Sequence, residues 1–238
     1  MNIKTLLFVF LMIIFKRTDL YCSCPDKPGS GFSNITQHDT LKKMQILYNG
    51  ILWSNKYRRI KGDQFLYNNL FLPGTVSING HTFKNLRIRY DIYSDEISTP
   101  LNREEIMQLN KEKVDSFTIS FENKVNRFIR IDKDSLKGLN GYVNVLYKGK
   151  SALYVKYIKE ISSSFTEHND GEFLQTYRIY FVKDNIVHLI IGKNDLLKVL
   201  NEDKVRIENF INKNKLKISK KVPDSFVPVI IYYDSISH

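Results

Sequence analysis

The side chains most often used in catalysis and metal binding are thinly spread along this sequence. Five histidines lack the spacing of metal ligands, and they are His38, His81, His168, His188 and His238. The paired carboxylates Asp95-Glu96 and Glu104-Glu105 are neighbours, and neighbouring residues on a strand point to opposite faces. The sequence contains no glycine-rich phosphate loop, HExxH, GxSxG or CxxC motif. It therefore predicts a protein that is not an enzyme and has no metal or other cofactor, although catalytic groups can also meet from distant positions.

The only two cysteines, Cys22 and Cys24, offer a different chemistry. A disulfide between them would close a loop too small to stabilise a fold, and a zinc site would need further ligands, of which His38 is the nearest. Two interpretations remain open: the cysteines are removed with a signal peptide, or one of them carries the lipid of a bacterial lipoprotein. Ser23 before Cys24 fits a lipoprotein signal, whereas Tyr21 departs from it, and the sequence favours plain export.

The residues up to Cys24 have the features of a secretory signal peptide. The unbroken apolar run Leu6–Phe15 follows a short basic start and is too short to cross a bilayer as a helix. Lys16-Arg17 and the lack of an Ala-x-Ala site weaken the fit, and a buried N-terminal helix or strand is the alternative. We expect a signal peptide over residues 1–24, a Pro-, Gly- and Ser-rich linker over 25–40, and a single β-rich domain over 41–238. The expected location is the bacterial periplasm or outer membrane, with or without a lipid anchor.

Positive charge is the property that most clearly points to a partner. The formal net charge is +11, which favours acidic partners such as anionic lipids and polysaccharides. The densest basic cluster, KYRRIK, contains Lys56, Arg58, Arg59 and Lys61. Arginine beside tyrosine is also typical of nucleic-acid binding, but no nucleic-acid motif accompanies the cluster and export argues against that partner. A solvated strand or loop face is the structural alternative. The stretch Lys213–Lys221 is also basic.

Most of the expected domain, residues 41–238, has the alternating pattern of β-strands, and these strands must position the basic residues. Residues 72–97 organise it, because polar and apolar residues alternate there and Asn79-Gly80 favours a two-residue type I′ turn. The second strand should have an apolar face with Leu86, Ile88 and Tyr90 and a solvent face with Arg87, Arg89 and Asp91. Further hairpins are predicted over residues 114–131, 142–161 and 176–191.

The hydrophobic period changes near residue 193, where two short helices are predicted with Asn194 and Asn201 as N-caps. Asp224–Tyr233 fits a strand or a helix, and its capping residues favour a helix. The residues expected to be buried are Leu196, Leu197, Leu200, Ile207, Phe210 and Ile211. Helices this short need tertiary packing, and we expect it from the apolar face around Ile88. The predicted fold is α+β and mainly β, an antiparallel hairpin-built sheet (a sandwich or half-barrel) covered by a C-terminal pair of short helices at about residues 193–236.

Three stretches resemble a group of uncharacterised exported proteins of Bacteroidota-type bacteria. They are GTVSINGHTFKNLRIRYDIYSDEI, GYVNVLYKGKSALYVKY and NDLLKVLNEDKVRIENFINKNKLK. The resemblance rests on the spacing of Gly, Tyr-Asp and aromatic positions, implies a cell-envelope location and brings no activity. It also implies O-glycosylation at Asp-Ser/Thr followed by an apolar residue, for which Thr40, Ser135 and Ser235 are candidates. Asp-Ser is equally typical of a helix cap or turn.

Two functions are compatible with these features. The leading hypothesis is a non-enzymatic binding or structural module whose sheet or basic face engages an envelope component: a protein, an acidic polysaccharide or a lipid. The alternative is a carrier of an apolar ligand, held in a cavity between a curved sheet and the helices. An enclosed apolar cavity would favour the carrier, whereas a filled core beside a basic face would favour the binding module. The sequence leaves the oligomeric state open.

Overall fold

The structure is a computed structural model that describes residues 44–132, 135–162 and 170–237. The chain divides into residues 1–39 and 40–238, and every described residue belongs to the second unit. The predicted signal peptide and linker therefore lie outside the described residues, as do Cys22, Cys24 and Thr40.

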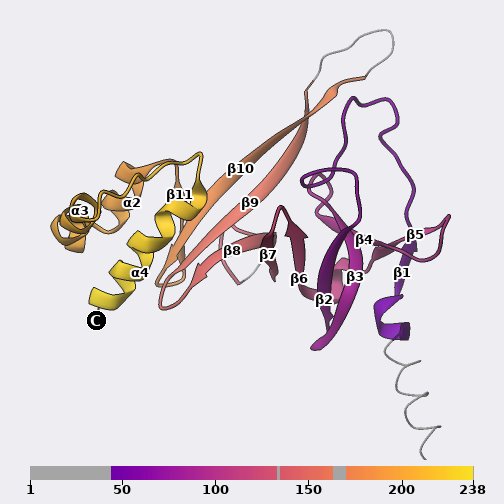
Figure 1. Cartoon of the computed structure of the whole chain (residues 1–238), viewed down its shortest axis with the longest axis horizontal. Coiled ribbons are helices and arrows are strands. Elements are labelled where there is room, and N and C mark those ends of the chain that lie inside the picture. The colour runs from indigo at the N-terminus through magenta and orange to yellow at the C-terminus, as the bar shows by residue number, and fades with distance from the viewer. Residues whose placement is uncertain (1–43, 133–134, 163–169, 238) are drawn as a thin grey trace, which may run out of the picture. The chain divides into compact units, whose positions relative to one another are not determined.

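The described residues form one open antiparallel sheet of eleven strands in the order β1-β5-β4-β3-β2-β6-β7-β8-β9-β10-β11 (Figure 1). The strands are β1 (Gly50–Leu52), β2 (Leu72–Ile78), β3 (His81–Asp91), β4 (Glu96–Pro100), β5 (Ile106–Leu109), β6 (Val114–Phe121), β7 (Lys124–Ile131), β8 (Gly141–Lys148), β9 (Ala152–Ser162), β10 (Glu172–Lys183) and β11 (Ile186–Ile190). The predicted mainly β fold with an antiparallel, hairpin-built sheet is confirmed.

Two-residue turns set the register of the hairpins. Asn79 and Gly80 join β2 to β3 with φ angles of 48° and 77°, as the predicted type I′ turn requires. Asp184 and Asn185 join β10 to β11 with φ angles of 52° and 60°. Asn and Asp tolerate this left-handed conformation better than most residues do, so local sequence placed these turns correctly.

The sheet curls so strongly that aromatic side chains from distant strands meet on its inner face. Tyr90 on β3 and Tyr142 on β8 have ring centroids 5.9 Å apart, although four strand spacings separate them, on the order of 19 Å in a flat sheet. Phe117 and Phe128 stack between them at 4.7 Å, and all four rings are buried. The apolar face around Ile88 is thus filled by the sheet's own side chains.

The helices cover the other end of the sheet. They are α2 (Lys193–Val199), α3 (Lys204–Lys213) and α4 (Val227–Ile236), with 3-10 turns at Lys111–Lys113, Asn201–Asp203 and Pro223–Phe226. Their buried side chains pack on Leu153 and Val155 of β9, on Phe181 of β10 and on Ile190 of β11. The expectation that they cover the face around Ile88 is wrong, because the curled sheet leaves no room there. The predicted helix over Asp224–Tyr233 is confirmed as α4, preceded by a 3-10 turn.

Three details of the helix prediction need correction. Gly192 rather than Asn194 precedes α2, and Asp203 rather than Asn201 precedes α3; neither makes a side-chain cap hydrogen bond. Phe210 is only half-buried, because its ring stacks on Tyr232 of α4 at the margin of the helices, with centroids 4.1 Å apart. The other five apolar residues predicted to be buried are buried.

Candidate functional site

The predicted basic cluster, here called the first basic segment (residues 56–61), lies against the beginning of β10. Lys61 N–H donates to the Gly171 carbonyl at 2.9 Å, and Phe173 N–H donates to the Lys61 carbonyl at 3.0 Å. The side chains then pair: Arg59 Nη2 lies 2.9 Å from Asp170 Oδ1. Lys61 Nζ lies 3.1 Å from Glu172 Oε1. Two of the four predicted binding cations therefore have their charge cancelled by a neighbouring acid.

The remaining two cations of that segment, Lys56 and Arg58, are exposed, and neither forms an ion pair within the described part of the chain. Two isolated charges beside two neutralised pairs make a weak electrostatic surface. The first basic segment therefore forms a contact between an irregular segment and the sheet, and its role as a binding patch stays a prediction.

A second basic segment, residues 213–221, has a different environment. Its lysines are all exposed, and they are Lys213, Lys215, Lys217, Lys220 and Lys221. The segment contains no acidic residue, and no ion pair to these lysines occurs among the residues that the structure describes. The sequence showed its basic character, but nothing local showed that it would stay unneutralised.

The second basic segment is held in place by the residues between its lysines. Leu216 and Ile218 are partly buried and pack against the core under the helices. Tyr177 Oη on β10 donates to the Lys220 carbonyl at 2.8 Å. Ser219 N–H donates to Ser225 Oγ at 3.0 Å. Apolar and lysine residues alternate from 215 to 218, so anchoring the apolar side chains directs the lysines to solvent.

A hollow of about 490 Å³ adjoins the second basic segment, lined by Arg206, Asn209, Phe210, Lys213, Asn214 and Tyr232. The Phe210 and Tyr232 rings form its apolar wall and are nearly parallel, at 4°. Arg206 is held by Asp203, at 3.4 Å between Nη1 and Oδ1, which leaves Lys213 as the cation of the hollow without an ion pair among the described residues. An apolar wall beside a cation and two amides can hold a ligand with both apolar and anionic parts.

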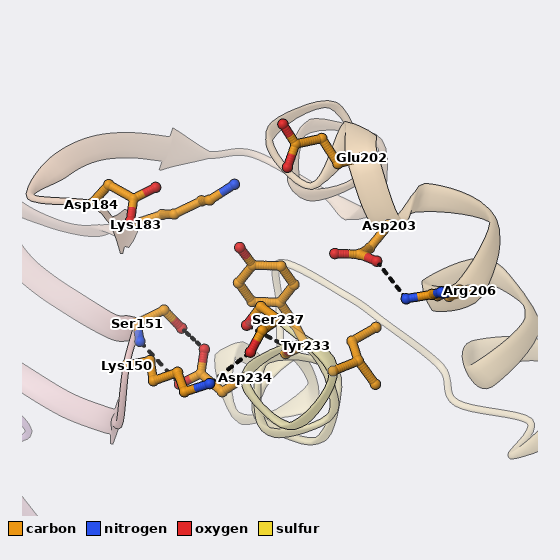
Figure 2. Close-up of a pocket in the computed structure, with 11 residues that line it drawn as sticks. Lys150, Ser151, Lys183, Asp184, Glu202, Asp203, Arg206, Tyr233, Asp234 and Ser237 are labelled. Atoms are coloured by element: carbon orange, nitrogen blue, oxygen red, sulfur yellow. Dashed lines mark hydrogen bonds and ion pairs between the residues drawn. The ribbon is translucent and has the colours of Figure 1, made fainter.

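A second hollow, of about 450 Å³, lies between the end of the β8–β9 hairpin and the helices (Figure 2). Asp234 of α4 is its best-buried acid. Asp234 Oδ2 accepts from Ser151 N–H at 3.0 Å and from Tyr147 Oη at 3.0 Å, and Oδ1 accepts from Ser151 Oγ at 2.7 Å. The carboxylate thus has donors on both oxygens and serves to anchor α4 to the β8–β9 turn.

The rest of that hollow carries balanced charge, because its lining includes the cations Lys150, Lys183 and Arg206 and the acids Asp184, Glu202 and Asp203 (Figure 2). Lys150 Nζ donates to the Ser237 carbonyl at 2.6 Å. Lys183 Nζ lies 5.6 Å from the Tyr233 ring centroid, and its hydrogen bond to Tyr233 raises the pKa of Lys183. These contacts join the C-terminal end of the chain to the sheet, which is a structural role.

A polar network closes the open side of the curled sheet. Asp95, in the turn between β3 and β4, accepts from Tyr90 Oη at 2.5 Å, from Lys111 Nζ at 2.9 Å and from Tyr142 N–H at 3.3 Å. It thereby links the two ends of the curl. Burial raises the pKa of Tyr90 and of Tyr142, and the nearby Asp95 carboxylate raises both further. Asp95 is held by cations and donors, as befits a structural carboxylate.

A buried arginine contradicts the predicted solvent face of β3. Arg89 is 6 % exposed, and its guanidinium carbon lies 3.7 Å from the Phe65 ring centroid and 4.6 Å from those of Trp53 and Phe71. Burial lowers the pKa of Arg89 to about 10. Asp91, predicted on the same face, is buried as well. The irregular segment 53–71 folds over this face. Because that segment has no hydrophobic periodicity, its packing on β3 could not be predicted from the sequence.

The predicted glycosylation residues occupy two kinds of position. Ser135 is exposed, and its Oγ donates to the Asp132 carbonyl at 2.8 Å. Ser235 is exposed on α4, and its Oγ donates to the Tyr232 carbonyl at 2.6 Å. The Asp234 of that second motif is the buried anchor described above. Modification at either serine stays a prediction.

Neither the family models, nor the curated proteins, nor the solved structures with which the chain was compared include a match to it. Within the described residues, no group of three or more His, Cys, Asp or Glu side chains is arranged to hold a metal ion. The helices in this part of the chain are all too short or too polar to cross a membrane.

Proposed function

We propose that this protein is an exported, non-enzymatic binding module of the bacterial cell envelope, and that it binds acidic polysaccharide through the second basic segment and the adjoining Phe210–Tyr232 hollow. One observation carries the proposal. Five exposed lysines lie in one segment, Lys213 at its start lines the hollow that contains the aromatic stack, and no acid among the described residues forms an ion pair with these lysines.

The charge argument concerns affinity. When a polyanion meets several lysines it releases condensed counterions, so binding strengthens with each contact and weakens steeply with salt. Exposed lysines contribute little to folding. Their concentration in one segment is therefore easier to explain by a partner than by stability.

The aromatic argument concerns the kind of polyanion. The concave hollow offers ring surface on which the C–H face of a sugar can pack. Asn209 provides an amide for hydroxyl groups, and Asn214, whose Nδ2 donates to the Phe210 carbonyl at 2.9 Å, provides its Oδ1 as an acceptor. A membrane surface would be better served by a convex apolar ridge that inserts between lipids. The concave, amide-lined wall favours a saccharide over a lipid.

The carrier alternative receives less support. The inner face of the curl is filled by four buried aromatic rings, and the helices pack on the sheet through a continuous apolar cluster. The hollow beside that cluster is lined mainly by charged and polar side chains. These features favour a binding surface over an internal ligand cavity.

The test compares binding to heparin and polygalacturonate with binding to neutral dextran, over a series of salt concentrations. A variant with Lys213→Glu and Lys215→Glu should lose at least about tenfold in affinity and have a shallower salt dependence. The matched control is Lys56→Glu with Arg58→Glu, which changes exposed cations of the first basic segment and should lose less than about threefold. Tyr232→Ser should weaken saccharide binding without changing the salt dependence.

Three outcomes would overturn the proposal. Equal losses from both sets of charge reversals would show general attraction to a basic protein. Binding to phosphatidylglycerol vesicles but to neither polysaccharide would assign a lipid partner. No salt-sensitive binding by the unmodified protein would mean that the positive charge has no polyanionic partner.

A further inference from the structure

The outer edge of β11 has the features of a protein–protein contact. β11 is the last strand of the sheet order, and among the described residues only β10 pairs with it. The segment 186–191, IVHLII, contains no charged residue, proline or glycine. Its side chains Ile186, Leu189 and Ile191 are 59 %, 50 % and 60 % exposed. Free strand edges are usually protected by lysine, proline, a bulge or very short length. β11 contains no lysine, no proline and no bulge.

The opposite edge of the sheet is built differently. β1 has three residues and pairs with β5, so it offers few backbone groups to another strand. β11 has five residues and an uninterrupted register with β10. Its free edge ends at Ile190, because Ile191 N–H donates to Asp195 Oδ2 at 3.1 Å. The available edge is therefore a defined strand of Ile186–Ile190.

We propose that two copies of this chain pair through β11, antiparallel and centred on His188, so that the sheets of the two subunits become continuous. The strand is complementary to itself in this register. Ile186 meets Ile190 of the partner subunit, Val187 meets Leu189 of the partner subunit, and His188 meets the partner's His188. Every pair except the central one is apolar, and a two-fold interface requires such self-complementarity.

The charges at the ends of the strand are compatible with this arrangement. Lys183 and Asp184 precede β11, and Lys193 and Asp195 follow it, so each end carries one cation and one acid. Antiparallel pairing therefore brings no block of like charge together.

The first experiment measures the mass of the full chain by sedimentation equilibrium over a range of concentrations. The unmodified protein should form a dimer, and Leu189→Lys should weaken its association at least about tenfold, because lysine on a strand edge opposes pairing. Leu174→Lys is the matched control, since Leu174 on β10 is 51 % exposed against 50 % for Leu189. It should leave the dimer unchanged. A monomer at every concentration, or a dimer that survives Leu189→Lys, would overturn the proposal.

The second experiment fixes the register by cross-linking, in a protein with Cys22→Ser and Cys24→Ser. His188→Cys places two cysteines opposite each other at the two-fold axis, within the Cα separation that a disulfide needs, and mild oxidation should give a covalent dimer. Ile186→Cys should not, because its counterpart would lie about four residues away along the strand, on the order of 13 Å. Cross-linking of Ile186→Cys but not of His188→Cys would overturn the antiparallel register.

Discussion

The two basic segments have similar composition and opposite surroundings. The first, residues 56–61, is joined to the beginning of β10 by backbone hydrogen bonds, and Asp170 and Glu172 neutralise half of its cations. The second, residues 213–221, is anchored by Leu216, Ile218 and Tyr177, whose contacts hold the segment in place without involving the ammonium groups of its lysines. A count of lysines and arginines would rank the segments together, and only their neighbours in space separate a structural contact from a candidate binding surface.

The largest expected change in the free energy of unfolding tests the buried core of the helices that support the second basic segment. Ile207 of α3 is fully buried, so Ile207→Ala should lower the free energy of unfolding by about 3 kcal/mol. Phe210→Ala, one helical turn away, should cost only about 1–2 kcal/mol, because Phe210 is half-buried against Tyr232. Urea denaturation measures both. An equal cost would mean that Phe210 belongs to the core, as its helical spacing alone predicted, and would remove it from the binding surface.

The next effect concerns the anchor of α4. Asp234→Ala removes an acceptor from Ser151 N–H, Ser151 Oγ and Tyr147 Oη, and it should lower the free energy of unfolding by roughly 2–3 kcal/mol. Asp224→Ala is the control, because the Asp224–Lys124 pair is exposed and is worth less than about 1 kcal/mol. Hydrogen exchange should increase around the second basic segment and stay unchanged around the first. Equal protection of both segments would contradict the inference that α4 supports the second one.

Alkaline pH should weaken the other half of the sheet. The pKa values of Tyr90 and Tyr142 are raised in the folded protein, whereas in the unfolded chain both lie near about 10. Above pH 10 the unfolded state therefore loses protons that the folded state keeps, and stability falls by up to about 1.4 kcal/mol per pH unit for each tyrosine. Lys156, whose pKa burial lowers, acts in the opposite direction below about pH 10.4.

Denaturation midpoints from pH 8 to 11 would measure this loss, and Tyr142→Phe should make the fall in stability with pH less steep. An unchanged slope would mean that Tyr142 ionises normally in the folded protein. Polyanion binding is therefore compared at neutral pH, where this loss of stability is absent.

The parts of the fold that were predictable from sequence are those with local causes. Asn79-Gly80 fixed the first hairpin because both residues accept positive φ, and strict alternation fixed β6 from Val114 to Phe121. The helices were found from their hydrophobic period, with Leu196 and Ile207 buried as expected. In each case the information lies within a few residues of the element that it specifies.

The parts that failed depend on contacts between distant residues. Arg89 lies on a strand face that alternation predicts to be solvated, but the Trp53 and Phe65 rings cover it. Both rings come from an irregular segment whose sequence has no hydrophobic periodicity to predict this packing. The helices were expected on the face around Ile88, but the curl of the sheet brings Tyr90 onto Tyr142 and fills that face first. Neutralisation of Arg59 depends on Asp170, more than a hundred residues later. Alternation and capping carry no information about such pairs.

The variant with the smallest expected change in stability gives the most direct test of the difference between the two basic segments. Asp170→Ala with Glu172→Ala removes the acids that face Arg59 and Lys61 and leaves the backbone hydrogen bonds of the first segment in place. Exposed ion pairs of this kind contribute little, so the free energy of unfolding should fall by less than about 1 kcal/mol. The first basic segment would then have four cations without these partners, close to the state of the second.

If freedom from neighbouring acids is what makes a basic segment bind polyanions, the double variant should bind heparin several-fold more tightly than the unmodified protein and with a steeper salt dependence. Adding Lys56→Glu and Arg58→Glu to it should reverse the gain. The matched control is Asp132→Ala with Glu112→Ala, which removes two exposed acids that pair with Arg130 and changes the net charge by the same amount. An equal gain in that control would show that heparin responds to net charge alone, and the distinction between the two segments would then have no bearing on binding.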